Sequence, residues 1–150
     1  MPISAGSWVN VSLRKNNTLA VTYCLLILLS RPKQIVIGRL GTFSFKRGNY
    51  IYVGSAKRNI EKRIERHLRK KKRKFWHIDY LLQYARIKRV LVSNLSEERI
   101  AAMLSAKMEI PVEKFGASDK KSESHLFFST KGELFSDYPL SLLTEIKKGL

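Results

Sequence analysis

Tyrosine, arginine and histidine side chains that could act together on a phosphodiester bond lie between residues 50 and 67. Tyr50 and Tyr52 alternate along an apolar run, so both leave a strand on the same face. Arg63 and His67 are four residues apart, a spacing that brings two side chains together on one face of a helix. An arginine neutralises phosphate charge, and a tyrosine or a histidine can transfer protons. The residue types and their spacing therefore predict phosphodiester chemistry in one cleft.

A strand, a glycine turn and a helix must position these groups. The run YIYVG at residues 50–54 predicts a strand that ends in a turn at Gly54. A helix is expected from about residue 58, because apolar residues then repeat at every fourth position. These apolar positions are Ile60, Ile64 and Leu68.

The remaining periodic segments predict one compact domain. Strands are expected at residues 20–29, 34–39, 42–46, 87–93 and 124–129, with a turn at 47–49 and a short strand at 8–13. Helices are expected at residues 75–85, 97–107 and 139–150, the second with Ser96 as its N-cap. We therefore expect an α/β (α+β) fold, in which a small mixed β-sheet is flanked by three to four helices. Its parts would be an N-terminal arm at 1–18, the domain at 19–130 and a helical tail at 131–150.

The composition favours a polyanionic partner. The chain has 29 Lys and Arg against 12 Asp and Glu, a net charge of +17 and a pI of about 10.3. Nucleic acid is the first expectation, and an anionic membrane is the second. Cys24 is the single cysteine, which excludes an intrachain disulfide or a cysteine-based zinc site and favours a buried position and a cytoplasmic protein. The apolar run at 19–29 is too short to span a bilayer, which takes about 20 residues as a helix. We interpret this run as a central strand rather than a signal peptide.

Several motifs resemble those of the GIY-YIG nuclease superfamily, which includes homing endonucleases and the incision subunit of bacterial excision repair. Residues 52–56 (YVGSA) and 61–67 (EKRIERH) resemble the second half of its signature, and 21–23 (VTY) takes the place of the first half, with valine for glycine. A branch of small archaeal and bacterial proteins of uncharacterised role is more similar. Its further motifs match WHIDYLL at 76–82, FGASD at 115–119 and SHLF at 124–127. Cysteines that this branch often carries after the FGASD motif are absent here, where Lys120, Lys121 and Glu123 stand.

The resemblance implies hydrolysis of a DNA phosphodiester bond with one Mg²⁺ or Mn²⁺ ion. Arg63 would hold the scissile phosphate, and one glutamate at the start of a helix, Glu97 or Glu98, would bind the metal. Tyr23 and Tyr52 would act as general base or orient the attacking water. Tyr23 lies among apolar neighbours, so a purely structural role in the core fits it nearly as well. His67 would relay a proton or contact phosphate.

Further basic residues are candidates for substrate binding. Six consecutive cations occupy residues 69–74, next to the predicted phosphate site, although such a run can also be a solvated segment or a nuclear import patch. The substrate-binding candidates are Arg66, Lys70, Lys71, Lys72 and His77. His125 is expected in the core or behind the site. Phe75 and Trp76 could stack on a base, but we expect burial against the sheet.

Two functions from different classes remain in competition. The first is a metal-dependent GIY-YIG endonuclease acting on DNA in repair or recombination, as a monomer. The alternative is a non-catalytic nucleic-acid-binding module on the same scaffold. Val21, the missing cysteines and the undecided choice between Glu97 and Glu98 favour this alternative. A protein that binds anionic lipid or ribosomal RNA is a third reading and depends on charge alone.

Overall fold

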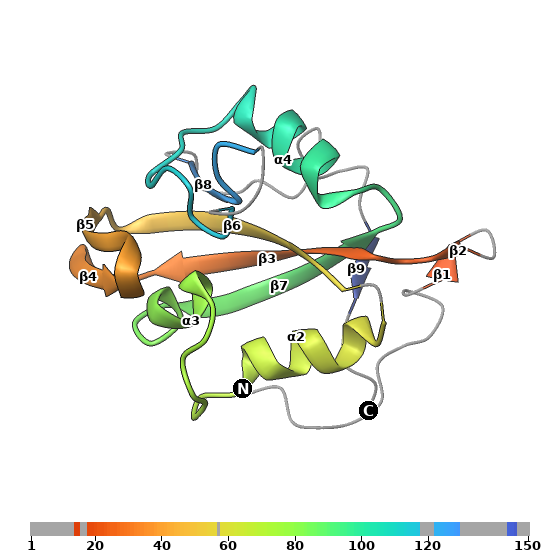
Figure 1. Cartoon of the computed structure of the whole chain (residues 1–150), viewed down its shortest axis with the longest axis horizontal. Helices are drawn as coiled ribbons and strands as arrows, with labels where there is room; N and C mark the ends of the chain where they lie inside the picture. Colours follow the sequence, from red (N-terminus) through yellow and green to blue (C-terminus); the bar gives the residue numbers. More distant parts are fainter. Residues whose placement is uncertain (1–13, 16–17, 57, 118–121, 130–143, 147–150) are drawn as a thin grey trace.

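A five-stranded antiparallel sheet forms the centre of the molecule (Figure 1). The computed structural model describes residues 14–15, 18–56, 58–117, 122–129 and 144–146. The strand order is β8-β6-β3-β7-β9. The strands are β3 (Thr22–Leu29), β6 (Gly48–Ser55), β7 (Arg86–Ser93), β8 (Leu126–Ser129) and β9 (Thr144–Ile146). The apolar run that could have suggested a membrane segment is thus the central strand β3, and no described helix is long and apolar enough to cross a membrane.

Helices cover both faces of this sheet. Figure 1 shows α2 (Ile60–Leu68) and α3 (His77–Leu81) on one side and α4 (Glu97–Ser105) on the other. Strand β3 can pack against helices on both faces of the sheet, because its successive side chains point to opposite faces. Tyr23 and Leu25 belong to the buried cluster that includes α2 and α3, whereas Cys24 and Leu26 pack with the apolar residues of α4.

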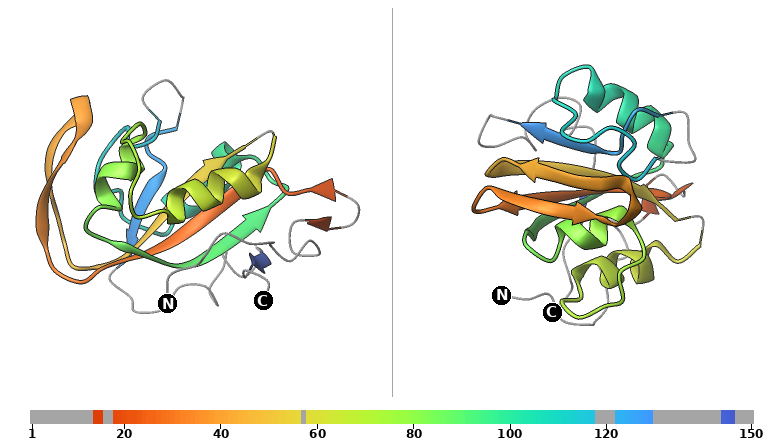
Figure 2. Two further views of the ribbon diagram at one scale, coloured as in Figure 1. Left: turned by 90° about the horizontal axis from the view of Figure 1, so that it is seen from below. Right: turned by 60° about the vertical axis from the view of Figure 1, so that its left-hand side comes forward.

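A hairpin connects β3 to β6 and extends beyond the sheet. It consists of β4 (Lys33–Ile37), the 3-10 turn η1 (Gly38–Leu40) and β5 (Gly41–Phe45). The left-hand view of Figure 2 shows it curling away from the end of the sheet. A short ladder of β1 (Arg14–Lys15) with β2 (Thr18–Leu19) precedes β3.

The predicted α+β class is confirmed, with three corrections and one difference in the sheet. The turn predicted at Gly54 is wrong, because Gly54 pairs with Tyr23 inside β6, which continues to Ser55. Every described strand pair is antiparallel, where a mixed sheet was expected. Residues 144–146 form a strand instead of part of a C-terminal helix, because they pair with Val90–Val92 of β7. The turn predicted at 47–49 is wrong for Gly48 and Asn49, which already pair within the sheet. The short strand at 8–13 and the rest of the predicted tail lie outside the described residues, and the division into arm, domain and tail stays a prediction.

Residues 75–85 form a shorter helix than predicted. Only His77–Leu81 is helical, since the Asp79 carboxylate accepts hydrogen bonds from the backbone N–H groups of Phe75 (2.8 Å) and Trp76 (2.9 Å). These bonds satisfy donors just before the helix begins, so Asp79 acts as a cap that keeps 75–76 outside it. The burial expected for Phe75 is also wrong, because its side chain is 78 % exposed.

Candidate active site

A cleft of about 440 Å³ opens at one edge of the sheet, where residues from both halves of the chain meet. Strands β3 and β6, helix α2, the start of α3, the start of α4 and the loop before β8 all contribute to it. Its lining residues are Tyr23, Tyr52, Gly54, Ser55, Arg63, Phe75, Trp76, His77, Glu97 and Gly116. Of the eleven predicted site residues, five lie here: Tyr23, Tyr52, Arg63, His77 and Glu97.

The short length of β8 explains the position of the cleft. β8 pairs with β6 only from Asn49 to Tyr52, so the last residues of β6, Gly54 and Ser55, extend past its end. At this uncovered edge the start of α4 and a side chain of α2 reach the same space, although the two helices pack on opposite faces. Glu97 and Arg63 can therefore face one ligand.

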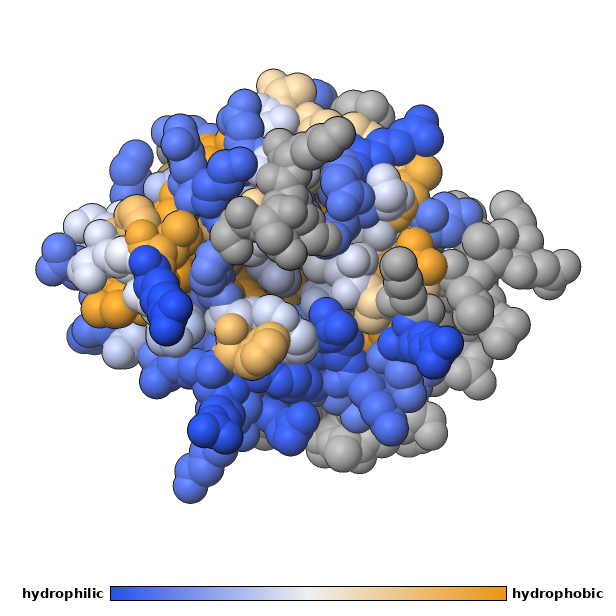
Figure 3. Space-filling model, in the orientation of Figure 1, coloured by the Kyte–Doolittle hydropathy of each residue, from blue (hydrophilic) through white to orange (hydrophobic). Residues whose placement is uncertain are grey.

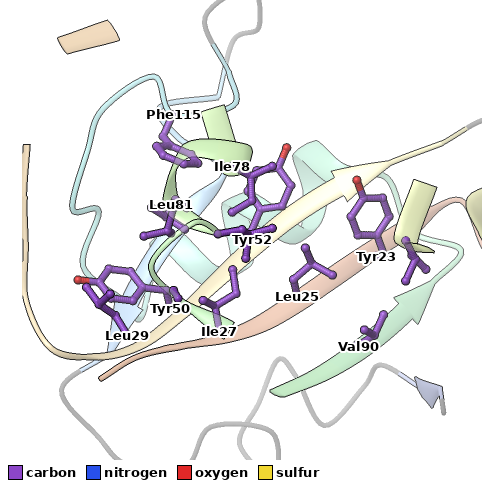
Figure 4. Packing of buried hydrophobic residues seen from close by; sticks show 14 of the residues in the cluster. Tyr23, Leu25, Ile27, Leu29, Tyr50, Tyr52, Ile78, Leu81, Val90 and Phe115 are labelled. Atoms are coloured by element: carbon purple, nitrogen blue, oxygen red, sulfur yellow. The ribbon is translucent and has the colours of Figure 1, made fainter. Parts of the chain in front are cut away.

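Gly54 provides the room for the Tyr23 side chain. The two residues are directly opposite in the β3–β6 ladder, and Figure 4 shows the phenols of Tyr23 and Tyr52 leaving these strands on one face. A β-carbon at position 54 would lie 2.5 Å from Cζ of Tyr23 and closer still to its oxygen. Only glycine lets the phenol pass across this strand into the cleft.

Both phenols are neutral at physiological pH. Burial raises the pKa of Tyr52 to about 12 and that of Tyr23 well above its ordinary value. The nearby Arg63 guanidinium acts in the opposite direction on both, but burial dominates. Neither tyrosine thus begins as a phenolate, so each can donate a hydrogen bond as well as accept one.

His67 lies behind Tyr23 and is not in the cleft wall. Its side chain is buried, and its Nε2 lies 2.6 Å from the Tyr23 hydroxyl oxygen. Burial lowers the pKa of His67 to about 3, so the ring is neutral. Nδ1 has no hydrogen-bond partner among the described residues. Because a buried N–H without an acceptor is costlier than a bare acceptor, we infer that Nε2 carries the proton and donates to Tyr23.

Two arginines of α2 lie over the same indole but have different partners. The guanidinium carbons of Arg63 and Arg66 are 4.5 and 4.3 Å from the centroid of the Trp76 ring, within the range of a cation–π contact. Arg66 forms a bidentate ion pair with Asp79 at 2.9 and 3.0 Å. Arg63 donates to the carbonyl of Ser55 at 3.2 Å and has no carboxylate partner within the described part of the chain.

Asp79 explains this division of roles. It is fully buried, and although burial raises its pKa, hydrogen bonds from Arg66, Trp76 and Phe75 hold the pKa below its ordinary value. The carboxylate is thus charged and forms its ion pair with Arg66. The Arg63 guanidinium therefore remains available to a ligand in the cleft.

His77 is oriented by the loop before β8. The backbone N–H of Gly116 donates to its Nδ1 at 2.8 Å, so the neutral ring carries its proton on Nε2. Partial burial lowers the pKa of His77, which favours this neutral form. Gly116 itself has a φ of +68°, where glycine is favoured, and it lies against the ring of Tyr52. His77 is therefore a hydrogen-bond donor at the cleft wall.

The two candidate glutamates are in different environments. Glu97 is buried and lines the cleft, with one carboxylate oxygen 3.4 Å from Nδ1 of the buried His125. Glu98 is exposed and is not part of the lining. The predicted cap is confirmed, because the Ser96 hydroxyl accepts a hydrogen bond from the N–H of Arg99 at 3.2 Å and so starts α4 at these residues.

A single carboxylate fits a magnesium ion better than a metal that needs several protein ligands. Among the described residues no group of three or more His, Cys, Asp or Glu side chains could hold a metal. Mg²⁺ keeps several of its waters and binds through one or two carboxylates together with substrate phosphates. Glu97 in the cleft wall is the donor that meets this requirement.

The cationic run after α2 has two kinds of side chain. Lys72 turns back and donates to the carbonyl oxygens of Arg66 (3.2 Å), His67 (2.6 Å) and Arg69 (2.9 Å), so it caps the C-terminus of α2. Burial lowers its pKa to about 8. Lys70 and Lys71 are exposed. Hydrophilic side chains gather over α2 and this segment in the lower half of Figure 3.

Sequence reasoning assigned direct substrate contacts to residues that the structure engages elsewhere. Arg66 and Lys72 are held by Asp79 and by backbone carbonyls, and neither lines the cleft. Five lining positions were not among the predicted site residues: Gly54, Ser55, Phe75, Trp76 and Gly116. All of them except Phe75 lie inside a motif that the resemblance had singled out, so the motifs held information that single-residue chemistry did not.

Comparisons with known proteins identify a family but not an activity. The family model described as "Domain of unknown function DUF123" matches residues 22–147. No curated protein and no solved structure matches the chain. The matched range includes every residue that lines the cleft.

Proposed function

The chain belongs to the DUF123 family, a domain of unknown function, and we propose that it is a metal-dependent endonuclease of the GIY-YIG type that hydrolyses DNA phosphodiester bonds. The observation that carries the proposal is the meeting of Tyr23, Tyr52, Arg63 and Glu97 in one cleft. These residues come from four different elements, and they are the ones that the motif resemblance assigns to such chemistry. The net charge of +17 supports a polyanionic substrate.

Arg63 and His77 bind the scissile phosphate in this proposal. The Arg63 guanidinium has no carboxylate partner within the described part of the chain, because Asp79 pairs with Arg66 instead. The contact with Trp76 holds that guanidinium at the cleft wall. The Nε2–H of His77 adds a neutral donor. Both interactions strengthen as charge accumulates on the phosphate oxygens in the transition state, which is the condition for faster chemistry.

Glu97 is the residue that would hold the divalent cation. When bound, the cation would act as a Lewis acid on a phosphate oxygen and stabilise negative charge there. Glu97 lies in the first turn of α4, so its carboxylate lines the same cleft as the Arg63 side chain of α2.

Tyr23 and Tyr52 orient the attacking water. Each phenol is neutral, so it can donate to the phosphate or accept from the water. Arg63 lowers the pKa of both phenols against the larger effect of burial, and the Tyr23 oxygen also lies 2.6 Å from Nε2 of His67, so either phenol could lose its proton during turnover.

Matched variants on the same helices test the proposal. Purified protein is incubated with supercoiled plasmid and with branched DNA in the presence of Mg²⁺ or Mn²⁺. Arg63→Ala and Glu97→Gln should abolish nicking. Lys62→Ala and Glu98→Gln change neighbouring exposed residues and should leave it intact. DNA binding by Arg63→Ala, measured in parallel, separates a loss of chemistry from a loss of affinity.

The alternative of a non-catalytic binding module predicts a different pattern. In that case the protein binds DNA in a salt-sensitive manner but cleaves no substrate with either metal. Nicking that is equal in wild type and Arg63→Ala would also reject the proposed site, because the activity would then come from other residues or from a contaminant.

A further inference from the structure

Phe75 is the most exposed of the large hydrophobic side chains that the structure describes. Its exposed fraction is 78 %, against 56 % for Val36 and 49 % for Tyr84. Burial of a phenylalanine side chain stabilises a fold, whereas this side chain is left largely exposed to solvent. Phe75 nevertheless lines the cleft, so its exposed ring is part of the candidate site.

The local structure fixes the position of Phe75 without covering its ring. Its backbone N–H donates to the buried Asp79 carboxylate at 2.8 Å, which anchors the chain at this point. The ring meets Trp76 with centroids 5.3 Å apart at an angle of 89°. A perpendicular contact of this kind covers at most one face of the ring, so the other remains open for stacking. The indole of Trp76 cannot serve in the same way, because two guanidinium groups lie over it.

The residues around Phe75 favour a nucleic acid as the ligand of its exposed ring. It directly follows the cationic run, of which Lys70, Lys71, Arg73 and Lys74 are exposed. Its ring is also close to the proposed phosphate ligand, since both Phe75 and Arg63 contact Trp76. The two contact distances, 5.3 and 4.5 Å, place the Arg63 guanidinium within about 10 Å of the Phe75 ring. One nucleotide can span that separation, with its phosphate on Arg63 and a base nearby on Phe75.

We propose that Phe75 stacks on an unpaired base next to the phosphate held by Arg63, so that the preferred substrates are nucleic acids with a single-stranded, flapped or bulged segment. The bases of an intact duplex are already stacked on both faces, so a ring at the cleft rim finds no open face there. An unpaired base offers one, and stacking on an aromatic side chain is worth about 1–3 kcal/mol per base. This inference rests on the proposed function, because it places the base beside the phosphate that the candidate site would cleave.

Binding without divalent cations tests the inference separately from cleavage. Fluorescence anisotropy is measured with a labelled single strand, with the same strand carried as a flap on a duplex, and with a blunt duplex. Phe75→Ala should weaken binding of the first two by about five- to 150-fold, the range set by the stacking energy. Binding of the blunt duplex should change less than twofold. Phe75→Trp should restore the preference, because it retains an aromatic face.

Tyr84→Ala is the matched control, since it removes another exposed aromatic ring that does not line the cleft. It should leave all three affinities unchanged. An equal effect of Phe75→Ala on all three substrates, or no effect on any, would overturn the inference. A loss of binding to phosphatidylserine vesicles without a loss of oligonucleotide binding would also overturn it, in favour of a membrane contact.

The cation-free readout keeps the two proposals distinguishable. If the flap preference depends on Phe75 but no variant shows cleavage with Mg²⁺ or Mn²⁺, the stacking site stands and the nuclease fails. If cleavage depends on Arg63 while Phe75→Ala leaves the flap preference intact, the nuclease stands and the stacking site fails.

Discussion

Replacing Gly54 with alanine should disturb the candidate site through the Tyr23 ring. A β-carbon at this position would lie 2.5 Å from Tyr23 Cζ and 2.8 Å from Cε2. Ordinary contact begins at 3.4 Å, so the ring has to retreat by about 1 Å. Tyr23 is only 1 % exposed and its hydroxyl is 2.6 Å from His67, so the ring cannot retreat without straining its neighbours or losing that hydrogen bond.

The expected loss of stability is about 2 kcal/mol. Overpacking of a well-filled core costs about 1–3 kcal/mol. Loss of the Tyr23–His67 hydrogen bond adds about 1 kcal/mol. Alanine is better than glycine inside a strand by about 0.5–1 kcal/mol, which offsets part of the loss. The same displacement moves the phenol within the cleft, so cleavage should fall together with stability.

A double-mutant cycle separates the steric argument from a general effect of the substitution. Urea unfolding is measured for wild type, Gly54→Ala, Tyr23→Leu and the double variant. In the Tyr23→Leu background the phenol is absent, so Gly54→Ala should be neutral or slightly stabilising, giving a coupling free energy of about 2 kcal/mol. Equal destabilisation by Gly54→Ala in both backgrounds would refute the reasoning, as would a Gly54→Ala protein as stable as wild type.

Three further variants test the buried polar groups. Because the pKa of His67 is lowered from 6.5 to about 3, the unfolded chain binds the proton more readily than the folded chain across that range. The free energy of unfolding should therefore fall as pH drops through it, by up to about 1.4 kcal/mol per pH unit, and His67→Phe should remove this slope in urea titrations at stepped pH. Asp79→Ala should lower the free energy of unfolding in urea by about 2–3 kcal/mol, since it removes the carboxylate partner of Arg66 and the cap before α3. This loss is smaller than for a fully buried ion pair, because the Arg66 side chain is 20 % exposed. Lys72→Met should lower the stability by about 1 kcal/mol through the lost contacts with the end of α2, whereas Lys71→Met should have no effect in the same thermal melts.

Patterns in the sequence predicted the elements that depend on residues close together in the chain. The apolar run of β3, the apolar spacing of α2 and the cap at Ser96 all depend on residues within a few positions of one another. The helical spacing of Arg63 and His67 was also correct, but one lines the cleft and the other is buried behind Tyr23. Periodicity places two residues on one face of a helix and does not say how deep that face lies.

Several features that the sequence did not predict depend on contacts between residues that are far apart in the chain. Arg66 was predicted to contact substrate because helical spacing does not reveal its carboxylate partner. Lys72 was predicted to do so because its hydrogen bonds go to backbone carbonyls, which no pattern of residue types reveals. Asp79, the partner of Arg66, is thirteen residues away and reaches it only through the packing of α3 beside α2. The strand β9 likewise forms at residues 144–146 because β7 offers an open edge, which no pattern in the tail itself reveals. Glu97 and Glu98 could be separated only once α4 was seen to bury the first and expose the second.

The charges in the cleft explain why binding and cleavage need not have the same requirements. Arg63 attracts a phosphate, whereas a charged Glu97 in the same cleft repels it. Without a cation the carboxylate therefore opposes the binding that the arginine supports, and a bound divalent cation turns that repulsion into attraction. The attraction of Arg63 and the repulsion of Glu97 do not affect Phe75 and the exposed lysines in the same way, because stacking and surface charge do not require the carboxylate to be neutralised. Under the proposed function, the rim would hold DNA with or without metal, while a cation at Glu97 would strengthen the binding of the phosphate to Arg63.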